Sequence, residues 1–361
     1  MRIIYTAVFS VCVIVTTVSG QAPSSPGHRI FAGTGRGVKN AKPYSVGQPR
    51  GTAETLAIGN PFGIELSGDQ IWITSVDDHC IYRGGQDGRK LERVVGNGLA
   101  GYSGDGGPAT DASFNWPHEV RVDDAGNLFV ADTRNHVIRR VDAATGIVTT
   151  LAGNGKPGFA GEGDRGTKVQ FKQPHSVVLD GKGGLLVADT VNHRLRRIDL
   201  KTGVVLTLSG TGEKKLPTDG ALAKEAPLHG PRSLAVDPDS IWIALREGNS
   251  IWRIDRKTKT IHHIAGTGAK GYSGDGGPPL KATFKGPKGL VMDNHRQLLV
   301  VDTENHAVRR INLATNRIDT VLGGTLSHQT FPLKRPHGIA FAPAVGYLVA
   351  DSEFHRVLQS Q

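Results

Sequence analysis

The sequence predicts an all-β fold, a six-bladed β-propeller whose ring is closed by a strand from the N-terminal part of the chain. Three observations lead to this prediction. One motif returns six times along the 361 residues; each copy divides into short apolar strands separated by turn residues; and the last copy lacks a final strand that a segment near the start can supply. Four-stranded antiparallel sheets repeated around an axis are the signature of a propeller.

The repeat is clearest in the copy that reads WPHEVRVDDAGNLFVADTRNHVIRRVDAATGIVTTLAGNG from Trp116 to Gly155. Strong copies also start at residues 173 and 286, and weaker ones at residues 60, 230 and 335. Each copy carries a marker proline at its second position: Pro61, Pro117, Pro174, Pro231, Pro287 and Pro336. We therefore expect the six blades to begin near residues 60, 116, 173, 230, 286 and 335.

Each copy is expected to form four strands, called a to d from the axis outwards. In the second copy they are Glu119–Asp123, Leu128–Ala131, Val137–Val141 and Ile147–Leu151. Turn residues rich in Asp, Asn and Gly separate them. The short apolar inner strands suit burial between neighbouring sheets.

The number of blades follows from the two ends of the repeat region. The last copy supplies only three strands before the sequence reaches Gln361, whereas His28–Gly33 resembles the outer strands of the other copies. We expect residues 28–33 to complete blade six as its outer strand, which closes the ring and removes two free sheet edges.

The first residues have the layout of a secretory signal peptide. Arg2 precedes an apolar run from residue 3 to residue 18, and small residues follow up to Gly20, where we expect cleavage. Residues 1–20 are then a signal peptide, residues 21–27 a short linker and residues 28–361 the propeller. The protein is expected to be secreted or periplasmic, with no membrane contact after cleavage; a retained anchor is the alternative.

Charge and cysteine content narrow the expected partners. The chain has 43 basic and 33 acidic residues, a net charge of +10, which favours an anionic small molecule, an acidic glycan or a protein partner. Nucleic acid is not expected, because no basic tract is interleaved with aromatic residues. Once Cys12 leaves with the signal peptide, Cys80 has no disulfide partner. We expect a monomer.

The motifs resemble a known family. The Pro-His start, the Asp-Thr-x-Asn-His turn followed by paired arginines, and the GDGGPAT connector are similar to NHL repeats of secreted bacterial proteins, and the resemblance covers residues 28 to 361. More distantly, the chain resembles the peptidyl-hydroxyglycine amidating lyases and lactonase-like propellers. The resemblance implies the fold; because propellers host lyases, hydrolases and pure binding modules, it does not imply one function.

The residue after each marker proline should lie at the innermost position of its blade. We therefore expect six residues to surround the mouth of the central channel: Phe62, His118, His175, Arg232, Lys288 and His337. The leading hypothesis is that this mouth binds an anionic ligand such as an acidic glycan or a sugar acid. The expected ligand-binding residues are His118, His175, Arg232, Arg246, Lys288 and His337. The alternative is a purely structural role.

Two further functions stay open. The resemblance to the amidating lyases implies zinc at the Pro-His positions, so His118, His175 and His337 are candidate metal ligands for a metal-dependent lyase or hydrolase. Calcium at Asp105 and Asp275 in the glycine-rich connectors is a second candidate for a divalent metal. The third function is a protein-interaction scaffold. No nucleophile is nominated.

A second repeated set is expected to be structural. It pairs an aspartate with a histidine four residues later, as in Asp132 and His136, and adds an arginine such as Arg140 on the next strand. Because an enzyme needs one site and this set occurs four times, we expect turn and inter-blade hydrogen bonds. Blade four departs from the pattern with Arg246 in its turn, which we expect near the channel mouth beside Arg232 and Lys288.

Overall fold

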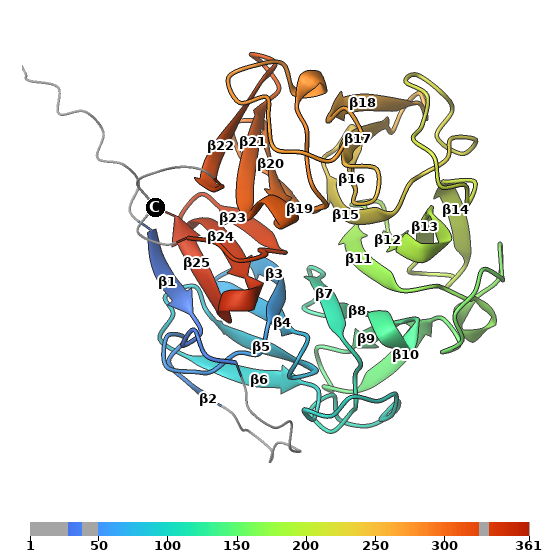
Figure 1. Ribbon diagram of the computed structural model, residues 1–361. Coiled ribbons are helices and arrows are strands. Elements are labelled where there is room, and N and C mark those ends of the chain that lie inside the picture. The colour runs from blue at the N-terminus through green and yellow to red at the C-terminus, as the bar shows by residue number, and fades with distance from the viewer. Residues whose placement is uncertain (1–27, 38–49, 325–331, 361) are drawn as a thin grey trace, which may run out of the picture.

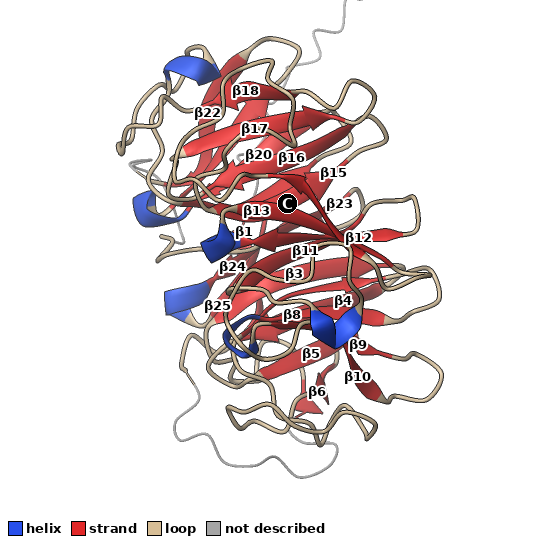
Figure 2. Ribbon diagram, turned by 90° about the vertical axis from the view of Figure 1, so that its right-hand side faces the viewer, coloured by secondary structure: helices blue, strands red, loops and turns tan. Residues whose placement is uncertain are grey.

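The computed structural model describes residues 28–37, 50–324 and 332–360, and the expected signal peptide and linker lie outside them. Within the described residues, six antiparallel sheets stand around a central axis, so the all-β propeller prediction is confirmed (Figure 1). Viewed from the side, the strands of successive blades stack as inclined layers with loops at both faces (Figure 2).

Blades one to three each contain four sequential strands. In blade one these are β3 (Pro61–Ser67), β4 (Gln70–Ser75), β5 (Cys80–Gly85) and β6 (Leu91–Val95), with the two-residue β2 (Arg50–Gly51) added at the outer edge. In blade two they are β7 (Pro117–Val122), β8 (Leu128–Asp132), β9 (Val137–Val141) and β10 (Val148–Ala152). In blade three they are β11 (Pro174–Leu179), β12 (Gly184–Asp189), β13 (Arg194–Asp199) and β14 (Val205–Ser209).

Blades four and five repeat the order, and blade six is completed from the other end of the chain. Blade four contains β15 (Pro231–Val236), β16 (Ser240–Leu245), β17 (Ser250–Asp255) and β18 (Ile261–Ala265). Blade five contains β19 (Pro287–Met292), β20 (Gln297–Asp302), β21 (Ala307–Asn312) and β22 (Arg317–Gly323). Blade six contains β23 (Ile339–Ala342), β24 (Gly346–Asp351), β25 (Arg356–Ser360) and β1 (His28–Ala32).

The β1 strand closes the ring. It pairs antiparallel with β25, from His28 opposite Ser360 to Ala32 opposite Val357. The guanidinium Nε of Arg29 also donates to Oε1 of Gln359 at 2.8 Å. The predicted N-terminal closing strand is therefore present in the structure.

Short 3-10 turns, which the sequence analysis did not predict, fill several connections. They are η1 (Thr133–Asn135), η2 (Gly166–Lys168), η3 (Thr190–Asn192), η4 (Pro279–Lys281), η5 (Thr303–Asn305) and η6 (Ser352–Phe354). Four of them occupy the turn between strands b and c, and the residue after each adopts a left-handed conformation. Among the described residues, no helix is long and apolar enough to cross a membrane.

The core lies between neighbouring blades. Between blades two and three, Phe129 and Ile138 of one sheet pack with Val177 and Val187 of the next, and Phe171 from the connector fills the same cluster. Each such aromatic ring, fully buried, contributes roughly 1.5–3 kcal/mol. These buried apolar clusters between the blades hold the inner strands at fixed positions around the axis.

The repeated aspartate and histidine make turn and inter-blade hydrogen bonds, as predicted. Asp132 accepts a hydrogen bond from the N–H of Asn115 at 2.7 Å, within its own blade, whereas His136 Nδ1 accepts from the N–H of Gln173 at 3.1 Å, across to the next blade. The same histidine link recurs at four further junctions: His79 to Trp116, His193 to Gly230, His306 to Arg335 and His355 to Asn60. In blade four, Asn249 Oδ1 replaces the histidine and accepts from Gly286 at 3.0 Å.

Arg140 makes turn hydrogen bonds, to Asn127 at 2.7 Å and to Asp142 at 2.9 Å, as expected, but the arginine beside it is the buried one. Arg139, not Arg140, is fully buried, with its guanidinium 4.8 Å from the ring of Phe114 and 2.7 Å from Asp105. Arg309 makes the equivalent 2.7 Å ion pair with Asp275 in blade five. Both connector aspartates considered for calcium are thus engaged by a buried guanidinium, so this geometry does not support the calcium hypothesis.

Candidate functional site

A recurring irregularity positions the residues at the channel mouth. In blade two, Pro117 pairs with Asp132 and Glu119 with Ala131, so His118 between them has no partner in the ladder. The register shifts in the same way after the marker prolines of blades one, three, four and five. A bulge of this kind bends the strand and re-aims the side chain of the extra residue. The residue after the marker proline therefore turns from the sheet into the channel.

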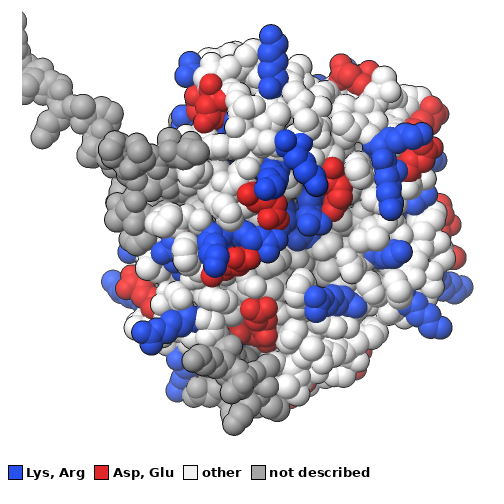
Figure 3. All heavy atoms as spheres, viewed as in Figure 1, with Lys and Arg blue, Asp and Glu red and all other residues white. Residues whose placement is uncertain are grey.

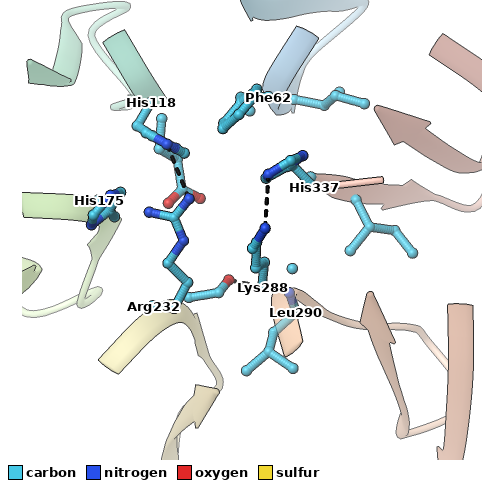
Figure 4. A pocket seen from close by; sticks show the side chains of 14 residues that line it. Phe62, His118, His175, Arg232, Lys288, Leu290 and His337 are labelled. Carbon is cyan, nitrogen blue, oxygen red and sulfur yellow. Dashed lines mark hydrogen bonds between the residues drawn. The ribbon is translucent and has the colours of Figure 1, made fainter. Parts of the chain in front are cut away.

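The structure brings all six expected mouth residues into one cavity. We call them the mouth ring: Phe62, His118, His175, Arg232, Lys288 and His337. Their side chains converge on the axis (Figure 4). The cavity measures about 30 Å³, more than the roughly 10–15 Å³ that one water molecule needs. The mouth ring thus admits a group of a few atoms, not a whole sugar.

Each cation of the mouth ring is hydrogen-bonded to a histidine. Arg232 Nη2 lies 3.0 Å from His118 Nε2, and Lys288 Nζ lies 3.1 Å from His337 Nε2. A histidine nitrogen can accept from a cation only when the imidazole is neutral. Burial lowers the pKa of His118 and His337 well below the ordinary value, and the neighbouring Arg232 and Lys288 lower it further. Both imidazoles are therefore neutral acceptors at pH 7.

The two cations are buried; Lys288 pairs with Glu304 at 3.2 Å, whereas no ion pair of Arg232 occurs among the described residues. Arg232 is 8% exposed and Lys288 is 6% exposed. Burial, together with repulsion from Arg246, lowers the pKa of Arg232 to about 9. Burial and repulsion from Arg232 lower the pKa of Lys288 to about 7. Arg232 Nη1 has no hydrogen-bond partner among the described residues. An anion at this point would favour the charged forms of Arg232 and Lys288 and would give Arg232 Nη1 an acceptor.

Phe62 closes the remaining side of the mouth ring. Its ring stacks on His337 with centroids 3.8 Å apart and meets the edge of His118 at 4.4 Å. His175, which is only partly buried, lies edge-on to His118 at 4.6 Å. One side of the mouth ring thus consists of aromatic side chains, and the other side carries Arg232 and Lys288 (Figure 4).

Arg246 does not line the cavity, and its role in ligand binding stays a prediction. Its guanidinium pairs with Glu247 at 2.7 Å and is 43% exposed. It acts on the cavity through its charge, because it lowers the pKa of both Arg232 and Lys288. Lys and Arg gather near the centre of this face, with acidic side chains between them (Figure 3).

The three candidate metal ligands do not fit one metal ion. The Nε2 atoms of His118 and His337 each face a cationic side chain, and His337 Nδ1 lies 2.8 Å from Ser352 Oγ. Across the described ranges of the chain, no three His, Cys, Asp or Glu side chains are grouped closely enough to hold a metal. This geometry does not support the zinc hypothesis, which stays a prediction open to direct measurement.

Sequence reasoning missed three charged residues further along the channel. Arg121 pairs with Glu119 and lies 3.5 Å from Glu65. Burial raises the pKa of both glutamates, although Arg121 opposes the shift. The sequence did contain a signal for this layer: the second residue after the marker proline is the charged Glu119 in blade two, whereas it is Ser176 in blade three and Ser233 in blade four. The channel thus has a second, ion-paired layer beneath the mouth ring.

The fold and the repeats define the class of this protein as a six-bladed β-propeller. The NHL repeat matches residues 114–140, 171–198 and 284–311, so the chain is a propeller with NHL repeats. These matches are blades two, three and five. They contain the Asp-Thr-x-Asn-His turns whose hydrogen bonds join the blades.

Two named proteins are similar in sequence to most of this chain. SUPPRESSOR OF QUENCHING 1, a chloroplastic protein of Arabidopsis thaliana, is 27% identical over 84% of this chain and 30% of its own length. NHL repeat-containing protein 2 of Gallus gallus is 26% identical over 81% of this chain and 45% of its own length. The chain thus spans less than half of these relatives.

Solved structures show the same fold at low identity. An auxiliary nutrient-binding protein from Bacteroides ovatus superposes with a TM-score of 0.65 at 13% identity, over 92% of this chain and 76% of its own. Virginiamycin B lyase from Staphylococcus aureus superposes with a TM-score of 0.51 at 16% identity, over 85% of this chain and 97% of its own. One propeller is a binding protein and the other an enzyme, so these likenesses establish the fold alone.

Proposed function

We propose that this propeller binds an anionic ligand whose charged group inserts one oxygen into the mouth ring while the body of the ligand lies above it. The single observation that carries this proposal is the pair of buried cations, Arg232 and Lys288. Their hydrogen bonds to neutral histidines supply no negative charge. Arg232 Nη1 offers an unused donor, and an anionic oxygen is the partner that such a donor favours.

The size of the cavity specifies how a ligand would bind. Because about 30 Å³ has room for a group of a few atoms but not for a whole sugar ring, the group that enters is the tip of a carboxylate, sulfate or phosphate. A sugar acid, the end of an acidic glycan, and an acidic side chain of a partner protein all present such a tip. The nutrient-binding relative in fold is compatible with this role, whereas the lyase shows that the fold can also support catalysis.

The location proposed for this activity is outside the cytoplasm. The support is the apolar segment between Arg2 and Gly20 with small residues at its end. N-terminal sequencing of the protein recovered from its native host should find Gln21 as the first residue. A chain that retains Met1 would contradict export by this route.

The test uses D-glucuronate as the probe and D-glucose as the uncharged control, measured by titration calorimetry at low ionic strength. Replacing Lys288 by Met keeps the length of the side chain and removes its charge. We expect Lys288→Met to weaken glucuronate binding by at least about tenfold, because charge-assisted hydrogen bonds are worth about 1.5–3 kcal/mol. Lys285→Met, at an exposed lysine of the same blade, should leave binding unchanged. Equal binding by both variants would refute the proposal.

A further inference from the structure

The turn residue above each mouth-ring residue follows a pattern within this chain. In blades four and five, where the mouth-ring residue is the cation Arg232 or Lys288, the middle of the turn between strands b and c is a glutamate, Glu247 or Glu304. Glu304 Oε1 lies 3.2 Å from Lys288 Nζ. Glu247 raises the pKa of Arg232, against the effect of burial. Lys288 is therefore paired with a carboxylate of its own blade, whereas Glu247 pairs with Arg246 and acts on Arg232 through its charge.

Two glycines make room for these glutamates. The residue before the marker proline is Gly230 in blade four and Gly286 in blade five, and both have positive φ, 68° and 63°. A Cβ on Gly230 would overlap Oε2 of Glu247, and a Cβ on Gly286 would lie 3.1 Å from Cγ of Glu304. The glycines thus let each carboxylate lie over the start of its own inner strand.

Blade six shows the contrasting case. Its mouth-ring residue His337 is neutral, and the residue before the marker proline is Arg335 rather than glycine. Its turn residue Glu353 pairs with Arg335 Nη1 at 2.9 Å and with Lys334 at 3.6 Å, both on the rim. A glutamate at the same turn position is therefore engaged with rim cations where the mouth ring carries no charge.

Glu304 can leave Lys288 without losing all of its partners. It also accepts hydrogen bonds from Arg335 Nη2 at 3.0 Å and Nε at 3.2 Å. Burial works against its charge, but the hydrogen bonds from Arg335 and Lys288 lower the pKa of Glu304 to about 2. It is ionised throughout the physiological range, and Arg335 would hold it after Lys288 has turned to another anion.

We propose that Glu304, together with Glu247 at the same turn position, determines specificity: Glu304 occupies the place of the ligand's carboxylate at Lys288 and yields it only to a molecule that brings a carboxylate of its own. This inference rests on the proposed function. On binding, the ligand oxygen replaces Glu304 at Lys288, while Glu304 stays on Arg335. A neutral molecule leaves the ion pair between Glu304 and Lys288 in place, because it offers Lys288 no charge in exchange.

The experiment compares two matched variants, Glu304→Gln and Glu353→Gln, with D-glucuronate as the probe at pH 6. Both glutamates occupy the same turn position and both pair with Arg335, but only Glu304 reaches a cation of the mouth ring. We expect Glu304→Gln to bind glucuronate about fivefold more tightly, since a competing ion pair between buried Lys288 and the partly exposed Glu304 is removed. Glu353→Gln should bind like the parent.

A pH profile gives a readout that a merely structural role would not move. Besides Glu304, the groups that act on Lys288 are all basic: Arg232, Arg246, Arg335 and His337. Removing Glu304 removes the neighbour that favours the charged form of Lys288. The pH above which glucuronate binding declines should therefore move down in Glu304→Gln and stay in place in Glu353→Gln.

The outcomes separate this inference from the proposed function. If the parent protein binds no glucuronate, or binds it equally after Lys288→Met, the proposed function fails. If binding depends on Lys288 but Glu304→Gln and Glu353→Gln behave alike, only the inference fails. Glu247→Gln tests the same idea independently at Arg232, and it should also tighten binding, which covers the case in which Glu304→Gln does not fold.

Discussion

The Nδ1 atom of His355 accepts a hydrogen bond from the backbone N–H of Asn60 at 3.0 Å, although 295 residues separate them. This bond joins blade six to blade one in the way that His136 joins blade two to blade three. Each such bond needs a neutral imidazole, since a protonated nitrogen cannot accept. The stability of the ring is thereby coupled to pH.

We predict that replacing His136 and His193 together by Asn makes the fold less sensitive to acid. Burial lowers the pKa of both histidines below the ordinary value of 6.5. As the pH falls past 6.5, the unfolded chain binds protons that the folded chain does not, so the free energy of unfolding decreases until the lower folded pKa is reached. Asn249 already serves as the acceptor at this position in blade four.

Urea unfolding between pH 7.5 and pH 5 measures this effect. The double variant should lose less stability over that range than the parent. His295→Asn, at an exposed histidine, is the control and should follow the parent curve. An equally steep loss in the double variant would show that these histidines do not carry the pH dependence.

A second prediction concerns the contact between the inner strands of blades six and one. A Cβ on Gly338 would overlap the backbone carbonyl oxygen of Phe62. Gly338→Ala should lower the free energy of unfolding by about 1–3 kcal/mol, the usual cost of overpacking. Gly107→Ala, where a Cβ would lie 3.5 Å from its nearest neighbour, should cost much less. Similar denaturation midpoints for the two variants would contradict the packing argument.

A third prediction is that Lys288→Met raises the stability of the fold while it weakens anion binding. The pKa of Lys288 is lowered from 10.5 to about 7, so keeping its charge in the folded state costs free energy. The cost is fully present below pH 7 and disappears as the pH rises to 10.5, where the unfolded chain also loses the proton. The gain should be about 2 kcal/mol at pH 6.

Thermal unfolding of the parent and Lys288→Met at pH 6 and pH 10 checks the sign of this effect. The difference in melting temperature should be large at pH 6 and small at pH 10. A variant that is less stable than the parent at pH 6 would mean that Lys288 contributes to folding instead.

The fourth prediction addresses the metal hypothesis. Because His118 and His337 each face a cation through Nε2, the protein purified without chelators should contain no stoichiometric zinc or calcium. Elemental analysis of the parent and of His118→Ala decides the matter. One equivalent of metal that is lost in His118→Ala would restore the metal-dependent lyase or hydrolase as the leading function.

The membership of the mouth ring could be predicted from the sequence because it depends only on repeat position. The residue after the marker proline has the same backbone geometry in each blade, so Arg232 and His118 could be placed together although 114 residues separate them. Blade one has Ser75 where most other blades have the turn aspartate, and the repeat position alone did not show which residue replaces that aspartate. Asp78, three residues after Ser75, takes over and accepts from Gly59 N–H at 2.8 Å.

The electrostatics of the mouth could not be predicted in the same way. Whether Glu304 reaches Lys288 depends on side-chain length and on the space above Gly286, which the repeat pattern does not encode. The size of the cavity depends on how Phe62 stacks on His337. The buried guanidinium of Arg139 was not predicted, because adjacent strand residues face opposite sides and the repeat alone does not say which side is buried.

The bulge after the marker proline has a consequence for how such proteins diversify. Because the extra residue lies outside the ladder in five blades, exchanging its side chain removes no inter-strand pair from the sheets. These five positions can therefore vary one blade at a time on an unchanged scaffold. A small combinatorial library over these positions should yield folded propellers whose mouths range from acidic to basic. Substitutions there would change which ligand is preferred without changing whether the protein folds.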